Sequence, residues 1–494
     1  MQQRSTATDR GNKQAILAII LVSYVMIVLD ISVVLTGLPR IQHDLGFSEA
    51  GLAWVQSAYT LTFGGFLLLG ARAGDILGRR RMFVAGMALF TLASLAIGLS
   101  PSESWMLAWR AIQGVGAAVL GPSTLALLQT NFAEGPERTR AISLYSAAAG
   151  VSATVGLVLG GVLADWLSWR VGFFVNLPIG MGAILAAYRF IPETSRQRGG
   201  FDVPGALAST AGMSALVYGF IRSAEAGWAD PLTSATLALA AVLIAGFVAI
   251  ERRAAQPILP LRLFASRERS GAYAARVLVL GAGVGFYFFT TLHLQEVAGY
   301  GPALTGLAFI PATVLNFPFA IATPRLIRRF GAGAVLVAGL VVGIIGTAWL
   351  SRASAGSGYL LSVALPMLLI GTSQGLTLSP LTAAGVADVA HKDAGAASGA
   401  VNVAHQTGSS VGLSVLVAVE GLGAGPLAGR ALLEHRVETA LGGAAVMLLL
   451  ALAIALTTIV RAAGWPAAAV RAAESTELAT AEESPLGVAA VKAH

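Results

Sequence analysis

The run Ala15–Leu38, AILAIILVSYVMIVLDISVVLTGL, decides the fold of this chain. It holds 24 residues and a single charged side chain, Asp30. At 1.5 Å per residue, a helix of this length extends about 36 Å, enough to cross a hydrocarbon layer of ~30 Å. A strand of a membrane barrel needs only about half as many residues. The run therefore predicts a membrane-spanning helix.

Comparable apolar runs recur as far as Arg461, and most of the charge lies in the short breaks between them. Only 12% of the 494 residues are charged, 56% are hydrophobic, and the mean hydropathy is +0.75, values that are atypical of a soluble protein. We therefore predict an all-α integral membrane protein with fourteen transmembrane helices. Their expected positions are about 15–38, 51–71, 82–100, 105–129, 141–164, 171–190, 204–222, 233–250, 271–294, 303–324, 332–351, 359–385, 398–420 and 440–460.

The distribution of basic residues predicts the orientation in the membrane. If the N-terminus is cytoplasmic, the cytoplasmic segments hold 24 of the 32 Lys and Arg residues and the opposite segments hold 6. Positive charge concentrates on the cytoplasmic side of membrane proteins, so both termini are expected there. The same bias explains the net charge of +7, and no nucleic-acid partner is needed to account for it.

Several features repeat between the two halves of the chain. The basic turn Gly78–Arg81 follows the second expected helix, and Arg328–Gly331 follows the tenth. Gln113-Gly114 and Gln374-Gly375 likewise occur in the fourth and twelfth helices. Paired six-helix halves are a common transporter plan. The expected organisation is a cytoplasmic N-terminus at 1–14, a six-helix bundle at 15–190, a linker at 191–270 with an inserted two-helix hairpin, a second six-helix bundle at 271–461, and a disordered tail at 462–494.

A set of short motifs occurs in order along these helices. They are LDISVV at 29–34, RAGDILGRRR at 72–81, RAIQG at 110–114, GLVLGG at 156–161, FFVNLPIG at 173–180 and GAASG at 395–399. As a set they resemble the major facilitator superfamily, and within it the fourteen-helix drug:proton antiporters of the EmrB/QacA type. The sequence departs from the family pattern at Ala71, Ala73 and Ile76 in the loop signature. It also has Leu157 where the antiporter motif has proline.

The resemblance implies a major facilitator fold and a bacterial multidrug efflux transporter of the cytoplasmic membrane. Such a protein would use the proton gradient and no cofactor, and it would work as a monomer. Gly156, Gly160 and Gly161 would form the helix 5 antiporter motif. A latch at the cytoplasmic mouth, which binds the end of a neighbouring helix in the outward-open state, would contain Gly74, Asp75, Gly78, Arg79 and Arg80.

Two charged residues stand inside otherwise apolar helices and are expected to couple proton movement to transport. A carboxylate in the bilayer costs about 2.5–3.5 kcal/mol on insertion scales, so Asp30 is a candidate acid that alternates between a proton and a cationic drug. Arg110 would modulate the pKa of a nearby acid. The alternatives are an Asp30 that reaches the surface or is permanently paired, and an Arg110 that clamps two helices. Whether the two pair directly is left open by the sequence.

The other candidates for a central substrate cavity are polar or aromatic side chains within the expected helices. They are Tyr59, Gln113, Tyr287, Gln295, Glu296, Asn402 and His405, in addition to Asp30. Aromatic faces can bind a planar cation, but aromatic side chains in membrane helices more often pack against other helices or lipid.

The expected function is proton-coupled efflux of lipophilic, cationic drugs by alternating access. An ATP-driven pump is disfavoured because no G-x-x-x-x-G-K-[ST] loop occurs. The chain has no cysteine, its histidines lack metal-ligand spacing, and no nucleophile–base constellation suggests an enzyme. Two alternatives remain: a proton-linked importer of a metabolite, which Leu157 permits, and a membrane sensor that transports nothing.

Overall fold

The computed structural model describes the backbone of residues 2–48, 50–132, 136–193, 202–254, 257, 259–354, 358–389, 394–423 and 425–460. The tail expected at 462–494 lies outside these residues. The helices of the N-terminal half are α1 (Gln2–Leu45), α2 (Ala53–Leu77), α3 (Arg79–Gly98), α4 (Glu103–Asn131), α5 (Pro136–Trp166), α6 (Trp169–Phe174) and α7 (Asn176–Phe190). Next come α8 (Val203–Ala226), α9 (Pro231–Arg253) and the short η1 (Leu261–Ala265). The C-terminal half contains α10 (Arg267–Leu292), η2 (His293–Val297), α11 (Pro302–Ala308), α12 (Ile310–Phe330), α13 (Ala332–Leu350), η3 (Leu360–Ala364), α14 (Leu365–Gly385), α15 (Ala394–Val419), α16 (Gly429–Ile454) and η5 (Ala455–Val460).

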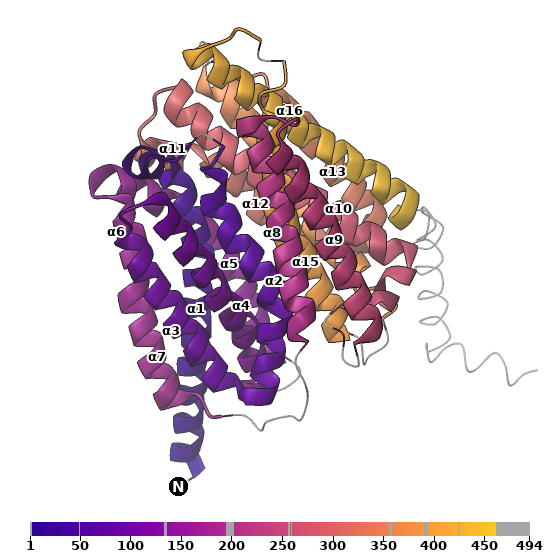
Figure 1. Cartoon of the computed structure of the whole chain (residues 1–494). Helices are drawn as coiled ribbons and strands as arrows, with labels where there is room; N and C mark the ends of the chain where they lie inside the picture. The colour runs from indigo at the N-terminus through magenta and orange to yellow at the C-terminus, as the bar shows by residue number, and fades with distance from the viewer. Residues whose placement is uncertain are drawn as a thin grey trace, which may run out of the picture.

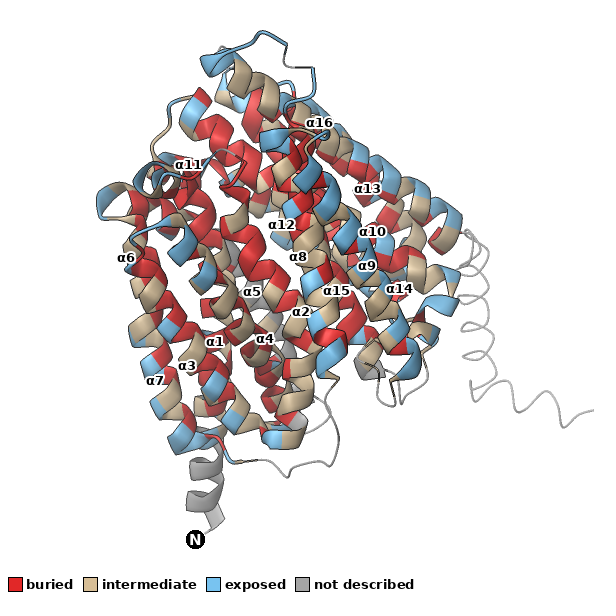
Figure 2. Ribbon diagram, in the orientation of Figure 1, coloured by how far each residue is buried: buried red, intermediate tan, exposed pale blue. Residues whose placement is uncertain are grey.

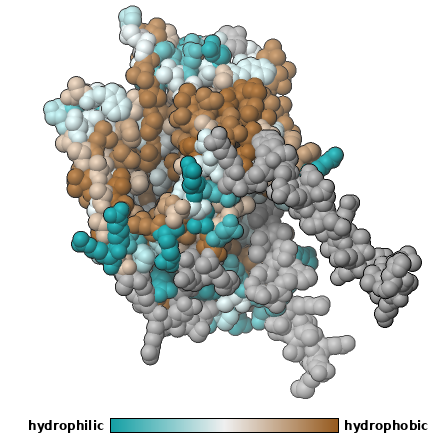
Figure 3. Space-filling view, turned by 90° about the vertical axis from the view of Figure 1, so that its right-hand side faces the viewer, coloured by the Kyte–Doolittle hydropathy of each residue, from teal (hydrophilic) through white to brown (hydrophobic). Residues whose placement is uncertain are grey.

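Apart from the short η1, the described helices form fourteen rods when segments that follow one another directly are joined, which agrees with the expected number. The joined pairs are α6 with α7, α10 with η2, α11 with α12, η3 with α14, and α16 with η5. Eleven described spans are long and apolar enough to cross a membrane. In Figure 3 the middle of the surface is largely hydrophobic, with hydrophilic side chains gathered toward the two ends. The chain is therefore an all-α, multi-pass membrane protein.

The rods form two bundles, with α8 and α9 beside both (Figure 1). Helices α1 to α7 pack among themselves on one side, and α10 to α16 pack among themselves on the other. Helices α8 and α9 pack mainly on each other, while α8 also contacts α2 and α15. The buried residues of Figure 2 lie along the faces that helices turn to one another, and the outward faces of α9 and α16 are more exposed.

Local sequence signals explain where several helices begin. Asp202 and Asp230 cap α8 and α9 by accepting hydrogen bonds from the backbone N–H groups of Gly205 and Thr233. The basic turns of both halves reverse the chain at one glycine: Gly78 (φ 109°) joins α2 to α3, and Gly331 (φ 83°) joins α12 to α13. Side chains other than glycine rarely adopt these angles, so each turn needs its glycine.

The repeated Gln-Gly pairs mark equivalent helix crossings. A Cβ on Gly114 would clash with the backbone of α2, and one on Gly375 would clash with the backbone of α12. Each glycine therefore allows the fourth helix of its half to approach the second closely. The crossings of α4 with α2 and of α14 with α12 support a repeat between the two halves.

The two halves meet closely on the face away from the N-terminus. A Cβ on Gly306 of α11 would lie 2.5 Å from the Leu157 carbonyl oxygen of α5, and Gln295 of η2 donates to the Thr36 carbonyl of α1 (2.9 Å). Toward the N-terminal face, α5 has few contacts with α12 among the described residues. The halves are therefore joined at this face and along α2 and α15, where a Cβ on Gly399 of α15 would clash with Leu68 of α2, and they separate along the α5–α12 side.

Candidate functional site

A buried ion pair joins α1 to α4. Nη1 of Arg110 lies 2.8 Å from Oδ2 of Asp30, and the side chains are 0% and 1% exposed. Nε of Arg110 donates to the Val55 carbonyl oxygen of α2 (2.9 Å). Asp30 and Arg110 therefore pair directly, which settles the question that the sequence left open.

Three neutral side chains complete this network. Gln113 donates to Oδ1 of Asp30 and to Oγ of Ser94, both at 2.9 Å, and its Oε1 accepts from Arg110 at 2.7 Å. Asn176 also donates to Oδ1 of Asp30 (2.9 Å) and to Ser94 (3.2 Å). The Asp30 carboxylate thus accepts three hydrogen bonds, from α4 and from the start of α7. All three bonds come from side chains of the same bundle, one of them charged.

Aromatic rings enclose the guanidinium. The Cζ atom of Arg110 lies 4.5 Å from the Tyr59 ring centroid and 5.9 Å from that of Phe173. Within the described part of the chain, Arg110 Nη2, the Tyr59 hydroxyl and Asn176 Oδ1 have no hydrogen-bond partner. Buried polar atoms without partners are costly, so this network has unused capacity for hydrogen bonds that another conformation or a ligand can satisfy.

Burial makes the two charges of the Asp30–Arg110 pair depend on each other. Two charges in a dry interior are tolerated only while each neutralises the other, and removal of one leaves an uncompensated charge. Protonation of Asp30 would leave Arg110 in that position, so the helices that carry them would have to rearrange. Loss of either charge would therefore favour a rearrangement of α1 relative to α4.

Glycines of the helix 5 motif allow α5 to pack closely against α1 beside this pair. A Cβ on Gly156 would lie 2.6 Å from Cβ of Ser32, and one on Gly160 would lie 2.6 Å from Cα of Val33. Gly161 instead faces the backbone of Pro302 in α11. Two of the three glycines therefore allow α5 to approach α1 beside Asp30, and the third allows it to contact the other half.

The basic turn between α2 and α3 binds the ends of two neighbouring helices. Arg79 donates to the Ala126 carbonyl (3.1 Å) and to the Thr130 hydroxyl (3.0 Å) near the end of α4. Arg80 lies 3.7 Å from the Glu193 carboxylate, just after α7. A Cβ on Gly78 would lie 2.7 Å from the same carboxylate, and Gly74 is buried nearby. The side chain of Asp75 is outside the described residues.

The other expected cavity residues are distributed over several places. Tyr59 and Gln113 belong to the Asp30 network, whereas the Tyr287 hydroxyl contacts Gln374 in the C-terminal half at 3.3 Å. Asn402 is exposed on α15, and His405, one turn later, contacts Arg276 of α10.

Gln295 and Glu296 lie at the face where the halves meet. Glu296 lines a cavity of 200 Å³. Gln42, Glu420 and Arg436 are among the other residues that line it. The eight expected residues therefore do not line a single cavity in this conformation.

Sequence reasoning missed two members of the network, Ser94 and Asn176. Asn176 was noted only as part of the FFVNLPIG motif, yet a buried amide at a break in an apolar helix is itself a signal of a polar partner. Ser94 offers no such signal, because serine often bonds its own helix and Ser94 also donates to the Phe90 carbonyl.

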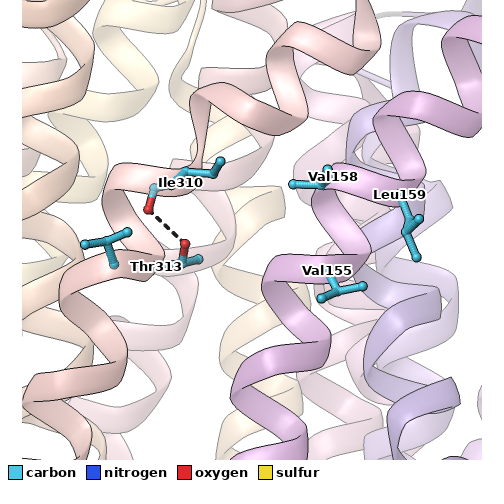
Figure 4. A pocket seen from close by; sticks show the side chains of 6 residues that line it. Val155, Val158, Leu159, Ile310 and Thr313 are labelled. Atoms are coloured by element: carbon cyan, nitrogen blue, oxygen red, sulfur yellow. Dashed lines mark hydrogen bonds between the residues drawn. The ribbon is translucent and has the colours of Figure 1, made fainter.

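An apolar pocket of 480 Å³ lies between the halves, where α5 and α12 begin to separate (Figure 4). It is lined by Val155, Val158 and Leu159 of α5 and by Ile310, Thr313 and Val314 of α12. Thr313 is the one polar residue among the six. Its hydroxyl donates to the Ile310 carbonyl (2.8 Å), so it is satisfied within its own helix (Figure 4). The pocket therefore suits an apolar occupant.

Known proteins with similar sequences are antibiotic export and resistance proteins. The cephamycin export protein of Amycolatopsis lactamdurans is 39% identical over 85% of this chain and 87% of its own length. The puromycin resistance protein of Streptomyces alboniger is 38% identical over 81% and 80% of the two chains. The tetracenomycin C resistance and export protein of Streptomyces glaucescens is 33% identical over 82% and 76%.

Solved structures support the same fold. The bacterial homologue of the human lysosomal transporter Spinster, in an inward-facing and occupied conformation, gives a TM-score of 0.65 at 15% identity. The match covers 91% of this chain and 98% of that one. The sequence profile of the Major Facilitator Superfamily matches residues 20–413. This chain therefore belongs to the Major Facilitator Superfamily, as its motifs predicted.

Proposed function

We propose that this protein exports lipophilic drugs or antibiotics, cations among them, across the cytoplasmic membrane in exchange for protons. The observation that carries the proposal is the buried Asp30–Arg110 pair, in a network of otherwise neutral side chains. A membrane protein retains such a costly pair where it serves transport of ions or substrate. Asp30 is the proton-carrying acid, and Arg110 holds it ionised in this conformation.

The cycle alternates between two ways of neutralising Asp30. In one conformation Arg110 neutralises the carboxylate, and in the other a proton does. Each change of partner alters the packing of α1 against α4, which moves one half of the molecule relative to the other. The inward proton gradient drives the cycle without a cofactor, and a membrane potential of 100 mV adds ~2.3 kcal/mol per charge moved. Both termini are cytoplasmic in this proposal, and the monomer is the working unit.

The apolar pocket between α5 and α12 supports a lipophilic cargo that enters from the bilayer. Its 480 Å³ is in the range of drug-binding pockets, and four of its six lining residues are exposed hydrophobic side chains. The relatives whose names mention cephamycin, puromycin and tetracenomycin C point to antibiotics as the cargo class.

Proton release from energised, inverted membrane vesicles tests this proposal. The vesicles would contain a pH-sensitive dye and be exposed to ethidium, with wild type, Asp30→Asn and Asp30→Glu compared. We expect ethidium to release protons in wild-type vesicles and to release none with Asp30→Asn. Glu keeps the acid but shifts its position, so Asp30→Glu should retain part of the response.

Asp44→Asn provides a matched control. Asp44 is an acid on the same helix and bonds Trp169, outside the Asp30 network. It should leave proton release unchanged. Drug-induced release that survives Asp30→Asn would remove Asp30 from the coupling step. Proton and drug movement in the same direction would overturn efflux in favour of import.

A further inference from the structure

The C-terminal half buries a guanidinium that no carboxylate neutralises. Arg276 of α10 is 7% exposed, and no ion pair to it occurs within the described part of the chain. It lies nine residues into α10, about 13 Å along the helix axis, within the first half of the span Arg267–Val297. An arginine at the centre of a membrane helix costs about 2.5–3.5 kcal/mol on insertion scales, and a buried one without a counter-ion is also unfavourable at this depth. A residue this costly needs a reason beyond packing.

The contacts of Arg276 leave hydrogen-bond donors unused. Nη1 donates to the Thr382 hydroxyl of α14 at 2.9 Å, and Nη2 lies 3.3 Å from Nδ1 of His405 in α15. The buried Nε atom has no partner within the described residues. A guanidinium has five N–H donors, and only two are directed at these partners.

The neighbours of Arg276 add no negative charge. The Thr382 hydroxyl donates to the Leu378 carbonyl (2.7 Å), so it accepts from Arg276. Because an Arg276 N–H points at Nδ1 of His405, that nitrogen is the acceptor and Nε2 carries the hydrogen. The cluster Arg276–Thr382–His405, drawn from three helices, therefore holds a positive charge and the N–H donors of Arg276 and His405, with no acid among the described residues to neutralise them.

One member of the cluster reaches the surface of the protein. Thr382 is exposed, and so is Asn402, which precedes His405 by one turn of α15. The Thr382 hydroxyl therefore links the buried guanidinium to the exposed surface of α14.

From these observations we infer that Arg276, Thr382 and His405 form a binding site for an oxyanion, and that the carboxylate of an anionic or zwitterionic cargo occupies it. Guanidinium groups bind carboxylate and phosphate through paired N–H donors, which Nε and an adjacent terminal nitrogen can supply. The phosphate of an anionic lipid has the same chemistry and is the competing source. This inference rests on the proposed drug transport, and it adds that one class of cargo carries a negative charge.

Binding to the purified protein in nanodiscs of zwitterionic phosphatidylcholine tests the inference. The probes would be a cephem carboxylate and its methyl ester, followed by tryptophan fluorescence. We expect wild type to bind the acid at least ten-fold more tightly than the ester. Arg276→Gln should abolish this preference, and Arg276→Lys should retain part of it, because it keeps the charge but loses the paired donors. Size-exclusion profiles establish that each variant is folded.

Arg267→Gln is the matched control, because Arg267 is an exposed arginine at the start of the same helix. It should keep the preference for the acid. Equal binding of acid and ester by wild type would overturn the inference, as would a preference that survives Arg276→Gln. Ethidium transport that depends on Asp30 would then still stand, so failure of the oxyanion site and failure of drug efflux are distinguishable.

A second arm separates cargo from lipid. Nanodiscs of phosphatidylglycerol would supply a phosphate headgroup, and native mass spectrometry would count retained lipid. Cargo binding predicts that the acid binds equally well in both lipids. The alternative result has two parts: wild type retains phosphatidylglycerol and Arg276→Gln does not, and wild type shows no preference for the acid in phosphatidylcholine. That result would assign the site to a lipid headgroup and overturn the inference that it binds cargo.

Discussion

Among the residues that the structure describes, each half of the molecule buries one arginine, Arg110 in α4 and Arg276 in α10. Arg110 lies 2.8 Å from a carboxylate and belongs to a network of five polar side chains. Arg276 contacts a hydroxyl and an imidazole, and within the described residues it has no acidic partner. The two arginines are similarly buried and differ in how their charge is compensated.

The difference indicates what each cluster can do. A neutralised network can remain closed and dry, and it responds when a proton removes one of its charges. An unneutralised cluster attracts a compensating anion from outside. We therefore propose proton coupling for the N-terminal half and recognition of an anionic group for the C-terminal half.

The largest expected effect comes from breaking the neutralised pair. Asp30→Asn or Arg110→Gln leaves one buried charge without its partner, which should lower the free energy of unfolding by about 3–5 kcal/mol. The double variant carries no buried charge and should lose less than the sum of the two. Titration with SDS in mixed micelles measures these free energies. Additive losses would mean that the two side chains do not interact energetically, contrary to their 2.8 Å separation.

The sequence was a good guide to the helices and a weaker guide to the partners within the site. Apolar length and loop charge predicted fourteen helices because each crossing must satisfy its own backbone. Asp30 and Arg110 were identifiable because a charge is conspicuous in an apolar run. Their direct contact, and the bonds from Ser94 and Asn176, depend on the rotation of four helices about their axes. Short motifs do not specify those rotations.

The next prediction concerns the packing that keeps the Asp30 network dry. A Cβ on Gly160 would lie 2.6 Å from Cα of Val33, an atom of the α1 backbone that cannot move alone. Gly160→Ala should therefore separate α5 from α1 and cost about 1–3 kcal/mol of unfolding free energy. Gly182→Ala in α7 is the control, because a Cβ there meets no atom within 4 Å. Equal unfolding free energies for these two variants would contradict the close approach of α5 to α1.

A smaller effect of opposite sign is expected in the C-terminal half. Arg276→Gln removes a buried charge that has no acidic partner, so it should raise the unfolding free energy by about 1 kcal/mol, at the expense of ligand binding. Apparent melting temperatures in detergent without added ligand would measure this. Thr382→Val distinguishes the effect of the charge from that of its hydrogen bond. It keeps Arg276 but removes the hydroxyl that accepts from it, so it should lower the unfolding free energy. A clear loss of stability in Arg276→Gln would mean that a resident partner already neutralises the arginine.

The smallest effect is expected where the geometry of the Asp30–Arg110 pair recurs in a more exposed place. Nε of Arg222 lies 2.7 Å from Oδ2 of Asp230, which also accepts from the N–H of Thr233 at the start of α9. The Arg222 guanidinium and this N–H lower the pKa of Asp230 from 3.8 to about 2. A lowered pKa contributes stability that is complete above pH 3.8 and is lost as the pH falls through 2.

Asp230→Asn tests whether burial, and not distance, sets the energy of such a pair. The melting temperature should fall slightly and by a constant amount between pH 5 and 7, and the difference should close as the pH approaches 2. High salt should reduce the difference, because a water-exposed pair is screened. A loss of stability as large as that of Asp30→Asn would show that a 2.7 Å contact makes such a pair strongly stabilising even without burial. A small, salt-sensitive loss would leave the closed environment of Asp30 as the reason that its pair with Arg110 can drive a conformational change.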